Sequence, residues 1–401
     1  MARKVRLAAG LLVVHTMLAV TPTVSGGDLE PPPSSVLVID GAPGRPAALW
    51  RVTPDGAVDK VVGTRWRPVT SPRRGLLAAV PSEASDEDGY AYSIVRPGTG
   101  SVRLPHRTSS SPCAAWSGDG RLLAYVSGEP ETYGTRGTLW IVHRRSPRRP
   151  VAAGSGLFPE CPAWSPEGHQ LAYMVQSAGS DRLWELLVYE DHRSEVAGTI
   201  HTRVTSLMGP TKHRTFDWFP GDQTLVWIQN HAIHIFQGGE TRRLTGPGVL
   251  RPIAELNENE ALRVYRSLRL SPDGSLIAVG LGYGAGVFAT DGSFVTAAKG
   301  ILRGWAGNLG ILTARPYRGV PSLLLHRAVQ QSQPELVQKY SKQTVATSPE
   351  GDWFAYRAPH RRELVFRRPD GSLLSRVALD LTFGAWMGAG KAGRVSVPPW
   401  P

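Results

Sequence analysis

A short motif recurs five times along the chain, and no other feature constrains the fold as strongly. Each copy begins with an apolar or aromatic residue, continues as Ser-Pro-Asp-Gly or a close variant, and ends in a run of mostly apolar residues. The copies are 115–125, 163–173, 217–227, 269–279 and 346–356. Their recurrence every 35–55 residues or so, with one gap of about double length, is typical of propellers and solenoids, in which each repeat is one supersecondary unit.

Each copy of the motif encodes a β-hairpin. In 271–274, proline presets φ for the turn, the acid accepts hydrogen bonds from the turn's own backbone, and glycine supplies a positive φ. The apolar run after the turn indicates a strand buried on both faces, as between packed sheets. We therefore assign a structural role to the repeat residues Trp116, Asp119, Trp164, Glu167, Trp218, Asp273 and Glu350.

A second hairpin follows each first one, marked by turns such as 54–56, 291–292 and 369–371. Two hairpins make a four-stranded unit, which is the size of a propeller blade. The sequence therefore predicts an all-β chain forming a single β-propeller. Degenerate copies near Thr70, Trp305 and Trp386 bring the expected count to eight blades, with seven as the alternative. We expect strands near the N-terminus to complete the C-terminal blade and close the ring.

The motif Trp-Ser-Pro-(Asp/Glu)-Gly followed by Leu-Ala-Tyr, as in 164–173, resembles the repeat of TolB-type propellers. The same repeat also occurs in the propellers of prolyl oligopeptidases. The resemblance extends from about Val36 to Val397. It implies a cell-envelope scaffold that binds other proteins. The matching residues belong to turns and core, so the resemblance transfers no binding residue.

The first 25 residues read as a secretory signal peptide. Three basic residues, Arg3, Lys4 and Arg6, precede the apolar stretch 7–20, and small residues follow at 23–26. An uncleaved membrane anchor is the alternative, and no other stretch is long and apolar enough to span a membrane. We expect a signal peptide over 1–25, a proline-rich linker over 26–35 and a propeller over 36–401, placing the mature protein outside the cell or in the cell envelope.

Two cysteines occupy equivalent positions in consecutive repeats. Cys113 and Cys161 each stand three residues before the tryptophan of their repeat, so we expect them on neighbouring inner strands, facing the central channel. In an oxidising compartment a disulfide between them is one hypothesis. Two thiols too far apart to bond are the alternative.

The net charge of +12 falls to +9 when the three basic residues of the signal are removed. Charge of this kind bears on solubility and nonspecific association rather than on fold. The sequence has no nucleic-acid-binding motif and no basic stripe interleaved with aromatic residues, so we expect no nucleic-acid partner.

Blade geometry divides the loops between two faces of the ring. The short-turn face holds the turns within hairpins, and the long-loop face holds the connections between hairpins and between blades. Function tends to reside on loops held by a rigid frame. We therefore predict a monomer that binds a protein or peptide through acidic and aromatic residues of the long-loop face, namely Asp86, Glu87, Asp88, Glu129, Tyr133, Glu255 and Glu258.

Catalysis is the less favoured interpretation. The chain lacks a Gly-x-Ser-x-Gly elbow and a His-Glu-x-x-His motif, and the recurring acids are better explained as turn residues. We expect no catalytic residue, metal or cofactor. The alternative is a propeller enzyme, a lyase or glycoside hydrolase, with its site at the mouth of the channel.

Overall fold

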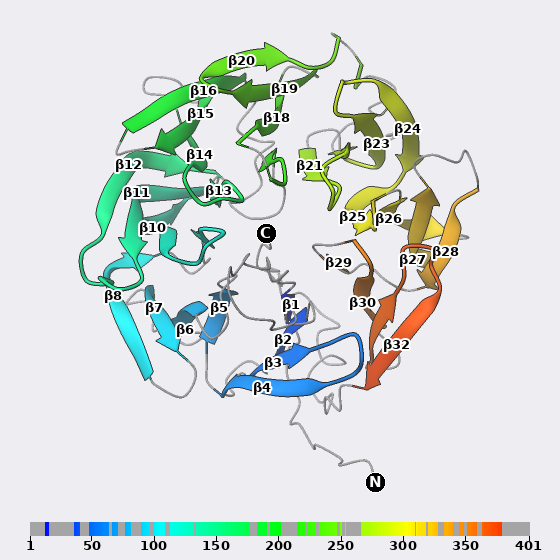
Figure 1. Cartoon of the computed structure of the whole chain (residues 1–401), viewed down its shortest axis with the longest axis horizontal. Coiled ribbons are helices and arrows are strands. Elements are labelled where there is room, and N and C mark those ends of the chain that lie inside the picture. Colours follow the sequence, from blue (N-terminus) through cyan, green and yellow to red (C-terminus); the bar gives the residue numbers. More distant parts are fainter. Residues whose placement is uncertain are drawn as a thin grey trace, which may run out of the picture.

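The computed structural model describes residues 13–15, 36–40, 48–63, 66–70, 77–81, 90–96, 100–108, 113–131, 134–159, 161–176, 183–190, 193–201, 215–221, 223–229, 232–246, 249–250, 253, 266–308, 310–317, 320–327, 333–339, 345–348, 351–358 and 363–378. Within them the regular elements are β-strands, arranged as eight four-stranded sheets around a common axis (Figure 1). The prediction of an all-β propeller is confirmed.

In the first half of the ring the strands are β1 Val13–His15, β2 Val36–Asp40, β3 Ala48–Val52, β4 Val58–Gly63, β5 Trp66–Thr70, β6 Leu77–Pro81, β7 Tyr90–Arg96, β8 Gly100–Thr108, β9 Ala114–Trp116, β10 Leu122–Glu131, β11 Gly134–His143, β12 Val151–Phe158, β13 Ala163–Trp164, β14 Leu171–Gln176, β15 Leu183–Glu190 and β16 Arg193–His201.

In the second half they are β17 Phe216–Trp218, β18 Leu225–Gln229, β19 Ala232–Gln237, β20 Glu240–Arg243, β21 Arg266–Leu270, β22 Leu276–Leu281, β23 Gly284–Ala289, β24 Phe294–Lys299, β25 Ile301–Ala306, β26 Gly310–Tyr317, β27 Val320–Arg327, β28 Glu335–Lys339, β29 Ala346–Thr347, β30 Phe354–Ala358, β31 Glu363–Arg367 and β32 Leu373–Ala378.

Every sheet is an antiparallel meander of four consecutive strands. The first strand of each lies nearest the axis and the fourth lies at the outer rim (Figure 1). Because consecutive strands alternate in direction, the turns within the two hairpins of a sheet lie on one face of the ring, and the remaining connections lie on the other. The predicted division into a short-turn face and a long-loop face follows from this topology.

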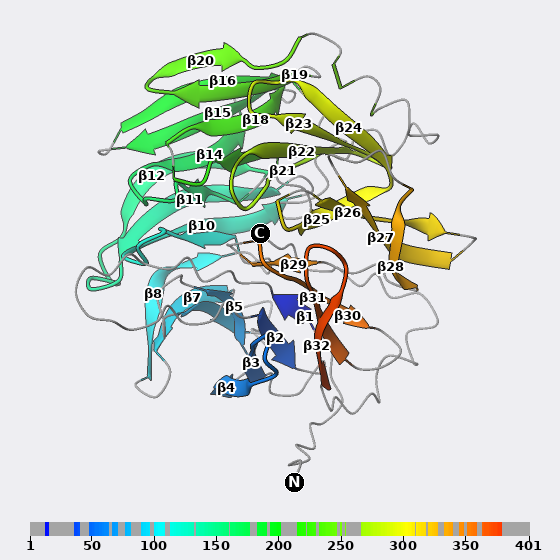
Figure 2. The ribbon, with the colours of Figure 1, turned by 45° about the vertical axis from the view of Figure 1, so that its right-hand side comes forward.

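The core lies between sheets rather than within one. One cluster of buried side chains joins β14–β16 to β17–β19, with Trp184, Phe216 and Trp227 fully buried. Five further clusters fill successive gaps, from the β5–β8 sheet round to the β29–β32 sheet. Figure 2 shows the sheets packed face to face around the ring. A strand that follows a repeat turn, such as β22, is therefore buried on both faces, which explains why the apolar runs after the turns do not alternate.

Closure of the ring differs from the sequence-based expectation. The sheet of β2, β3 and β4 takes its fourth strand from β1, with Val13 opposite Ile39 and His15 opposite Leu37. Among the described residues, no C-terminal strand pairs with β2. The degenerate copy near Trp386 lies outside the described residues. The first strand of this sheet thus comes from the segment that the sequence predicts to be a signal peptide.

Candidate functional site

A similar pattern of hydrogen bonds recurs in separate repeat turns. In the turn after β21, the Ser271 backbone amide donates to the carbonyl of Leu276, and the amide of Leu276 donates to Ser271 Oγ at 2.9 Å. Ser271 Oγ donates to Asp273 Oδ1 at 2.6 Å, and that oxygen also accepts from the amide of Ser275 at 3.0 Å. Gly274 has a φ of 73°, which glycine adopts without strain. The serine is fully buried, so the acid satisfies a group that water cannot reach.

Asp119 acts in the same way after β9. It accepts from Ser117 Oγ at 2.6 Å and from the amide of Arg121 at 2.9 Å. Glu167 lies in the corresponding turn after β13 and is exposed. In the last copy Glu350 lies outside the described residues, and Ser348 Oγ bonds to Asp352, two residues further along. The position of this acid varies because the buried serine needs an acceptor rather than a residue at one fixed place.

Four turn carboxyl groups, those of Asp55, Asp273, Asp291 and Asp370, have lowered pKa values and are held in their ionised form. At Asp55, the hydrogen bond from Thr53 is the main cause of a pKa below the ordinary value, and Ser293 and Ser372 act likewise on Asp291 and Asp370. At Asp273 burial opposes ionisation, but hydrogen bonds from Ser271 and Ser275 outweigh it and lower the pKa. A general acid working near neutral pH needs a raised pKa, so these acids suit turns rather than proton transfer.

The repeat tryptophans connect neighbouring sheets. Trp164 Nε1 donates to the carbonyl of Ala115 at 3.0 Å, and Trp218 Nε1 donates to that of Ala163 at 2.9 Å. Trp305, in a degenerate copy, donates to Arg269 at 3.2 Å. Each acceptor belongs to the first strand of the preceding sheet. The sequence assigned a structural role to Trp164 and Trp218, but it did not predict this hydrogen bond.

The two cysteines lie close to one interblade cluster. Cys113 is 1 % exposed and packs with side chains such as Phe158 and Tyr173, and Cys161 packs against the same cluster. Burial in this core means that Cys113 does not face the central channel as predicted. Both residues are thiols in the structure. Burial, followed by the two cysteines, raises the pKa of Tyr92, which places one tyrosine within electrostatic range of both. The disulfide stays a prediction, which alkylation of the unreduced exported protein would test.

The predicted partner-binding residues fall mostly in segments that the structure leaves undescribed. Asp86, Glu87, Asp88, Tyr133, Glu255 and Glu258 lie outside the described residues. Glu129 is exposed on β10, two residues from the end of the strand at the long-loop face, and is paired in register with Arg136.

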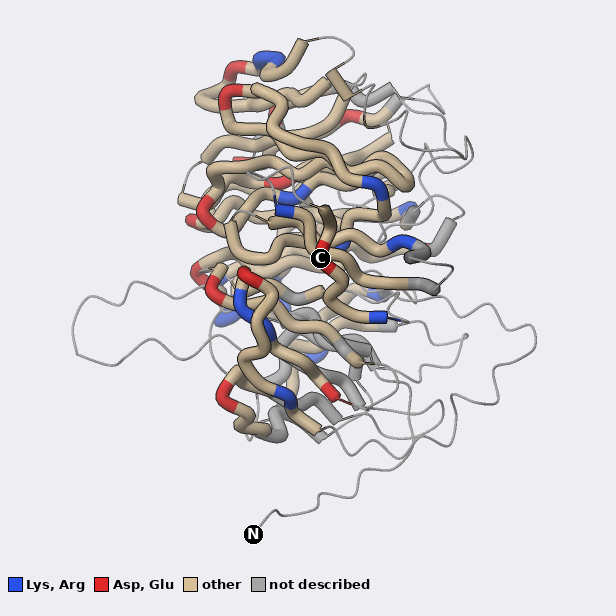
Figure 3. Tube along the Cα trace, turned by 90° about the vertical axis from the view of Figure 1, so that its right-hand side faces the viewer, with Lys and Arg blue, Asp and Glu red and all other residues tan. Residues whose placement is uncertain are grey.

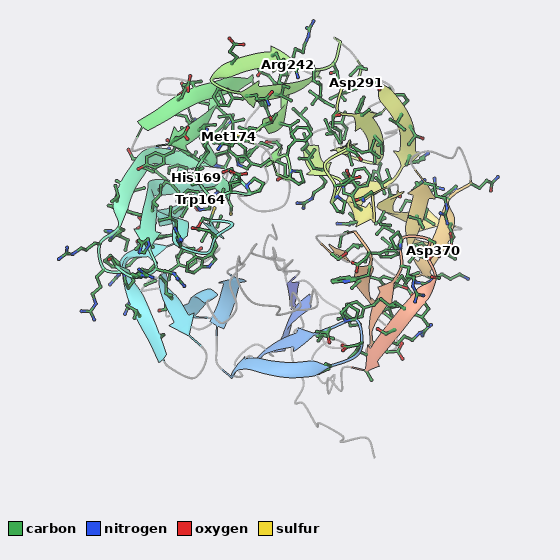
Figure 4. The ribbon with its side chains drawn as sticks, viewed as in Figure 1. Trp164, His169, Met174, Arg242, Asp291 and Asp370 are labelled. Carbon is green, nitrogen blue, oxygen red and sulfur yellow. The ribbon has the colours of Figure 1, made fainter. Side chains whose placement is uncertain are left out.

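The short-turn face is not uniformly basic. Arg145, Arg148 and Arg149 are exposed in the turn between β11 and β12. The turn acids occupy the same face, and Figure 3 shows acidic and basic residues intermingled along one edge of the ring. Asp291 and Asp370 lie near the outer rim (Figure 4). In the described part of the chain, charge alone does not distinguish the two faces.

Two structural tests bear on other classes of function. Among the described residues, no group of three or more histidine, cysteine, aspartate or glutamate side chains could hold a metal ion. Within the same residues, no helix has the length and apolarity to cross a membrane.

The chain is similar in fold to several solved structures. No family model matches the chain, and no curated protein matches it. Among solved structures it is similar to TolB from Acinetobacter baumannii, with 13% identity, 82% of this chain and 75% of that chain covered, and a TM-score of 0.38.

Two other propellers are also similar. The β-propeller domain of the Trilobed protease from Pyrococcus furiosus shares 12% identity, with 77% of this chain and 95% of that chain covered and a TM-score of 0.44. The β-propeller domain of Cps50 (Swd1) from Myceliophteria thermophila shares 16% identity, with 70% and 89% covered and a TM-score of 0.39.

Proposed function

We propose that the chain is an exported, noncatalytic propeller scaffold that binds a protein or peptide partner through its long-loop face. The propeller would follow a signal peptide over 1–25 and a linker over 26–35, and the mature protein would act as a monomer outside the cell or in the cell envelope.

The observation that carries this proposal is the way neighbouring sheets are joined. Apolar clusters fill the gaps between sheets, and tryptophan hydrogen bonds such as that from Trp218 to Ala163 connect the inner strands. Connections that leave such a frame start and end at fixed points, which is the arrangement that recognition loops use. The recurring acids support the same proposal because turn hydrogen bonds already occupy them.

Crosslinking capture from the envelope fraction of the source cell tests this proposal. A long-loop variant carries Glu129→Lys, Glu255→Lys and Glu258→Lys. A matched short-turn variant carries Arg145→Glu, Arg148→Glu and Arg149→Glu, all at exposed positions. We expect the parent chain and the short-turn variant to capture the same partner and the long-loop variant to lose it. Capture of no specific partner by the parent chain, or equal capture by both variants, would contradict the proposal.

A further inference from the structure

Two half-buried arginines in the β25–β28 sheet, Arg303 and Arg315, each have one buried side-chain nitrogen that forms no hydrogen bond. Arg303 lies in β25 where the register shifts between Leu302 and Gly304, and Arg315 lies on β26. The Nε atom of each is sealed from solvent and has no hydrogen-bond partner. The ion pairs found among the described residues involve other arginines, such as Arg327 with Glu335.

Both arginines belong to the gap between this sheet and the preceding one. Leu302, Trp305 and Ile311 pack there against side chains of β22 and β23. Alternation along β26 places Arg315 on the same face as Ile311. Burial lowers the pKa of Arg303, and Tyr283, in the turn between β22 and β23, opposes that shift. The Arg303 guanidinium is therefore within electrostatic range of the preceding sheet.

The polar groups nearby do not neutralise this charge. Thr313 Oγ1 lies 2.9 Å from His326 Nε2, on the same sheet. Burial, together with the neighbouring Arg315, lowers the pKa of His326 to about 4, so this imidazole is neutral at pH 7. Hydroxyl and imidazole groups add hydrogen-bonding capacity without negative charge.

Partial burial of a cation is unfavourable unless an anion lies close to it, and among the described residues neither guanidinium forms an ion pair. The guanidinium group presents a fork of donors that matches the paired oxygens of a carboxylate or a phosphate. Tyr283 and Gly300 lie in connections of the long-loop face. Gly300 has a φ of 133°, and a Cβ there would lie 2.8 Å from Thr313 Oγ1, so the backbone passes directly beside this polar group.

We propose that Arg303 and Arg315 form a binding site for an oxyanion, a carboxylate or a phosphate group, between the β21–β24 and β25–β28 sheets. The site does not require the partner proposed above, because a small anion can occupy it alone.

Thermal unfolding and calorimetric titration of the full chain, in a zwitterionic buffer of low ionic strength, test the site. Inorganic phosphate and acetate are the two probes, and whichever binds identifies the oxyanion class. For the parent chain we expect saturable heat and a Tm rise of about 2 °C at saturating probe. The variants Arg303→Met and Arg315→Met should lose this rise. Without anion they should unfold at or above the parental Tm, because a half-buried charge that forms no ion pair with the described residues has been removed.

Arg368→Met, at an exposed position in the turn between β31 and β32, is the matched control and should keep the full rise. Arg303→Lys preserves the charge but not the fork, and we expect it to weaken binding at least tenfold. Absence of binding by the parent chain to both probes would overturn the proposal, as would an unchanged rise in the Met variants. If the Met variants do not fold, unchanged affinity in Arg303→Lys would overturn it.

Discussion

At the scale of single residues, the tryptophans have the largest structural role. The sequence indicated a structural role for them because each recurs directly before a tight turn. It could not predict the acceptor, since the carbonyl that receives each indole hydrogen bond lies about 50 residues earlier in the chain for Trp164 and Trp218. Arg303 and Arg315 were missed for a related reason. Arginine is common in this chain, and only packing distinguishes a half-buried guanidinium with a sealed Nε from a solvated one.

Trp218→Phe tests the interblade hydrogen bond. Phenylalanine retains most of the apolar surface but leaves the Ala163 carbonyl without its buried donor, so we expect a loss of about 1–3 kcal/mol in the free energy of unfolding. Trp140→Phe is the control, because Trp140 donates within its own sheet to Ser127 Oγ and is only partly buried. Chemical denaturation measures both. An equal loss of the free energy of unfolding in the two variants would show that the interblade hydrogen bond contributes no more than a bond within one sheet.

At the scale of the element, the hairpin is what the sequence specifies best. Serine, proline, acid and glycine determine the turn locally, and the structure places a positive φ at Gly120, Gly168, Gly274 and Gly351. The last copy shows the limit of local inference. The Ser348 hydroxyl bonds to Asp352, four residues further along, whereas the Ser271 hydroxyl bonds to Asp273, two residues further along, so sequence position alone does not identify the acceptor.

Asp273→Asn tests the role of the turn acid. The pKa of Asp273 is lowered in the folded state, so its contribution to stability is complete above the unfolded value near 4 and is lost as pH falls through the folded value. We expect Asn to cost about 1 kcal/mol at pH 7 and to make the decline in Tm between pH 5 and pH 3 shallower. Thermal melts across this range measure both effects. A parallel shift of the whole curve would mean that the charge of Asp273 plays no part.

At the scale of the whole molecule, the repeats predicted the propeller, but the expected closure, with N-terminal strands completing the C-terminal blade, differs from the structure. The N-terminal strands have strand-like composition without a motif, so the sequence could not determine which segment pairs with β2. The structure assigns β1, which lies inside the predicted signal peptide. Removal of residues 1–25 would leave β2 with an open inner edge, a liability that sheet proteins normally cover.

Hydrogen exchange tests the closure. In a chain starting at residue 26, we expect a C-terminal segment to take the place of β1, so that the β2 amides stay protected. A second chain, which also starts at residue 26 but ends at residue 378, should then lose the protection of the β2 amides. The terminal sequence of the exported protein establishes whether β1 is present in the mature form. Equal exchange at Leu37 and Ile39 in the two shortened chains would contradict closure by the C-terminal segment.

The tryptophan bonds also bear on how such a ring changes its size in evolution. In the copies at Trp164 and Trp218, the acceptor is the residue immediately before the tryptophan position of the preceding copy. The copy at Trp164 therefore carries one donor, Trp164, and one acceptor, Ala163, in two adjacent residues. A gene duplication that inserts a whole repeat supplies both at once, and a deletion removes both, so neither event leaves an unmatched group in the neighbours. Blade number can change while the indole hydrogen bonds of repeats such as the one at Trp164 are preserved.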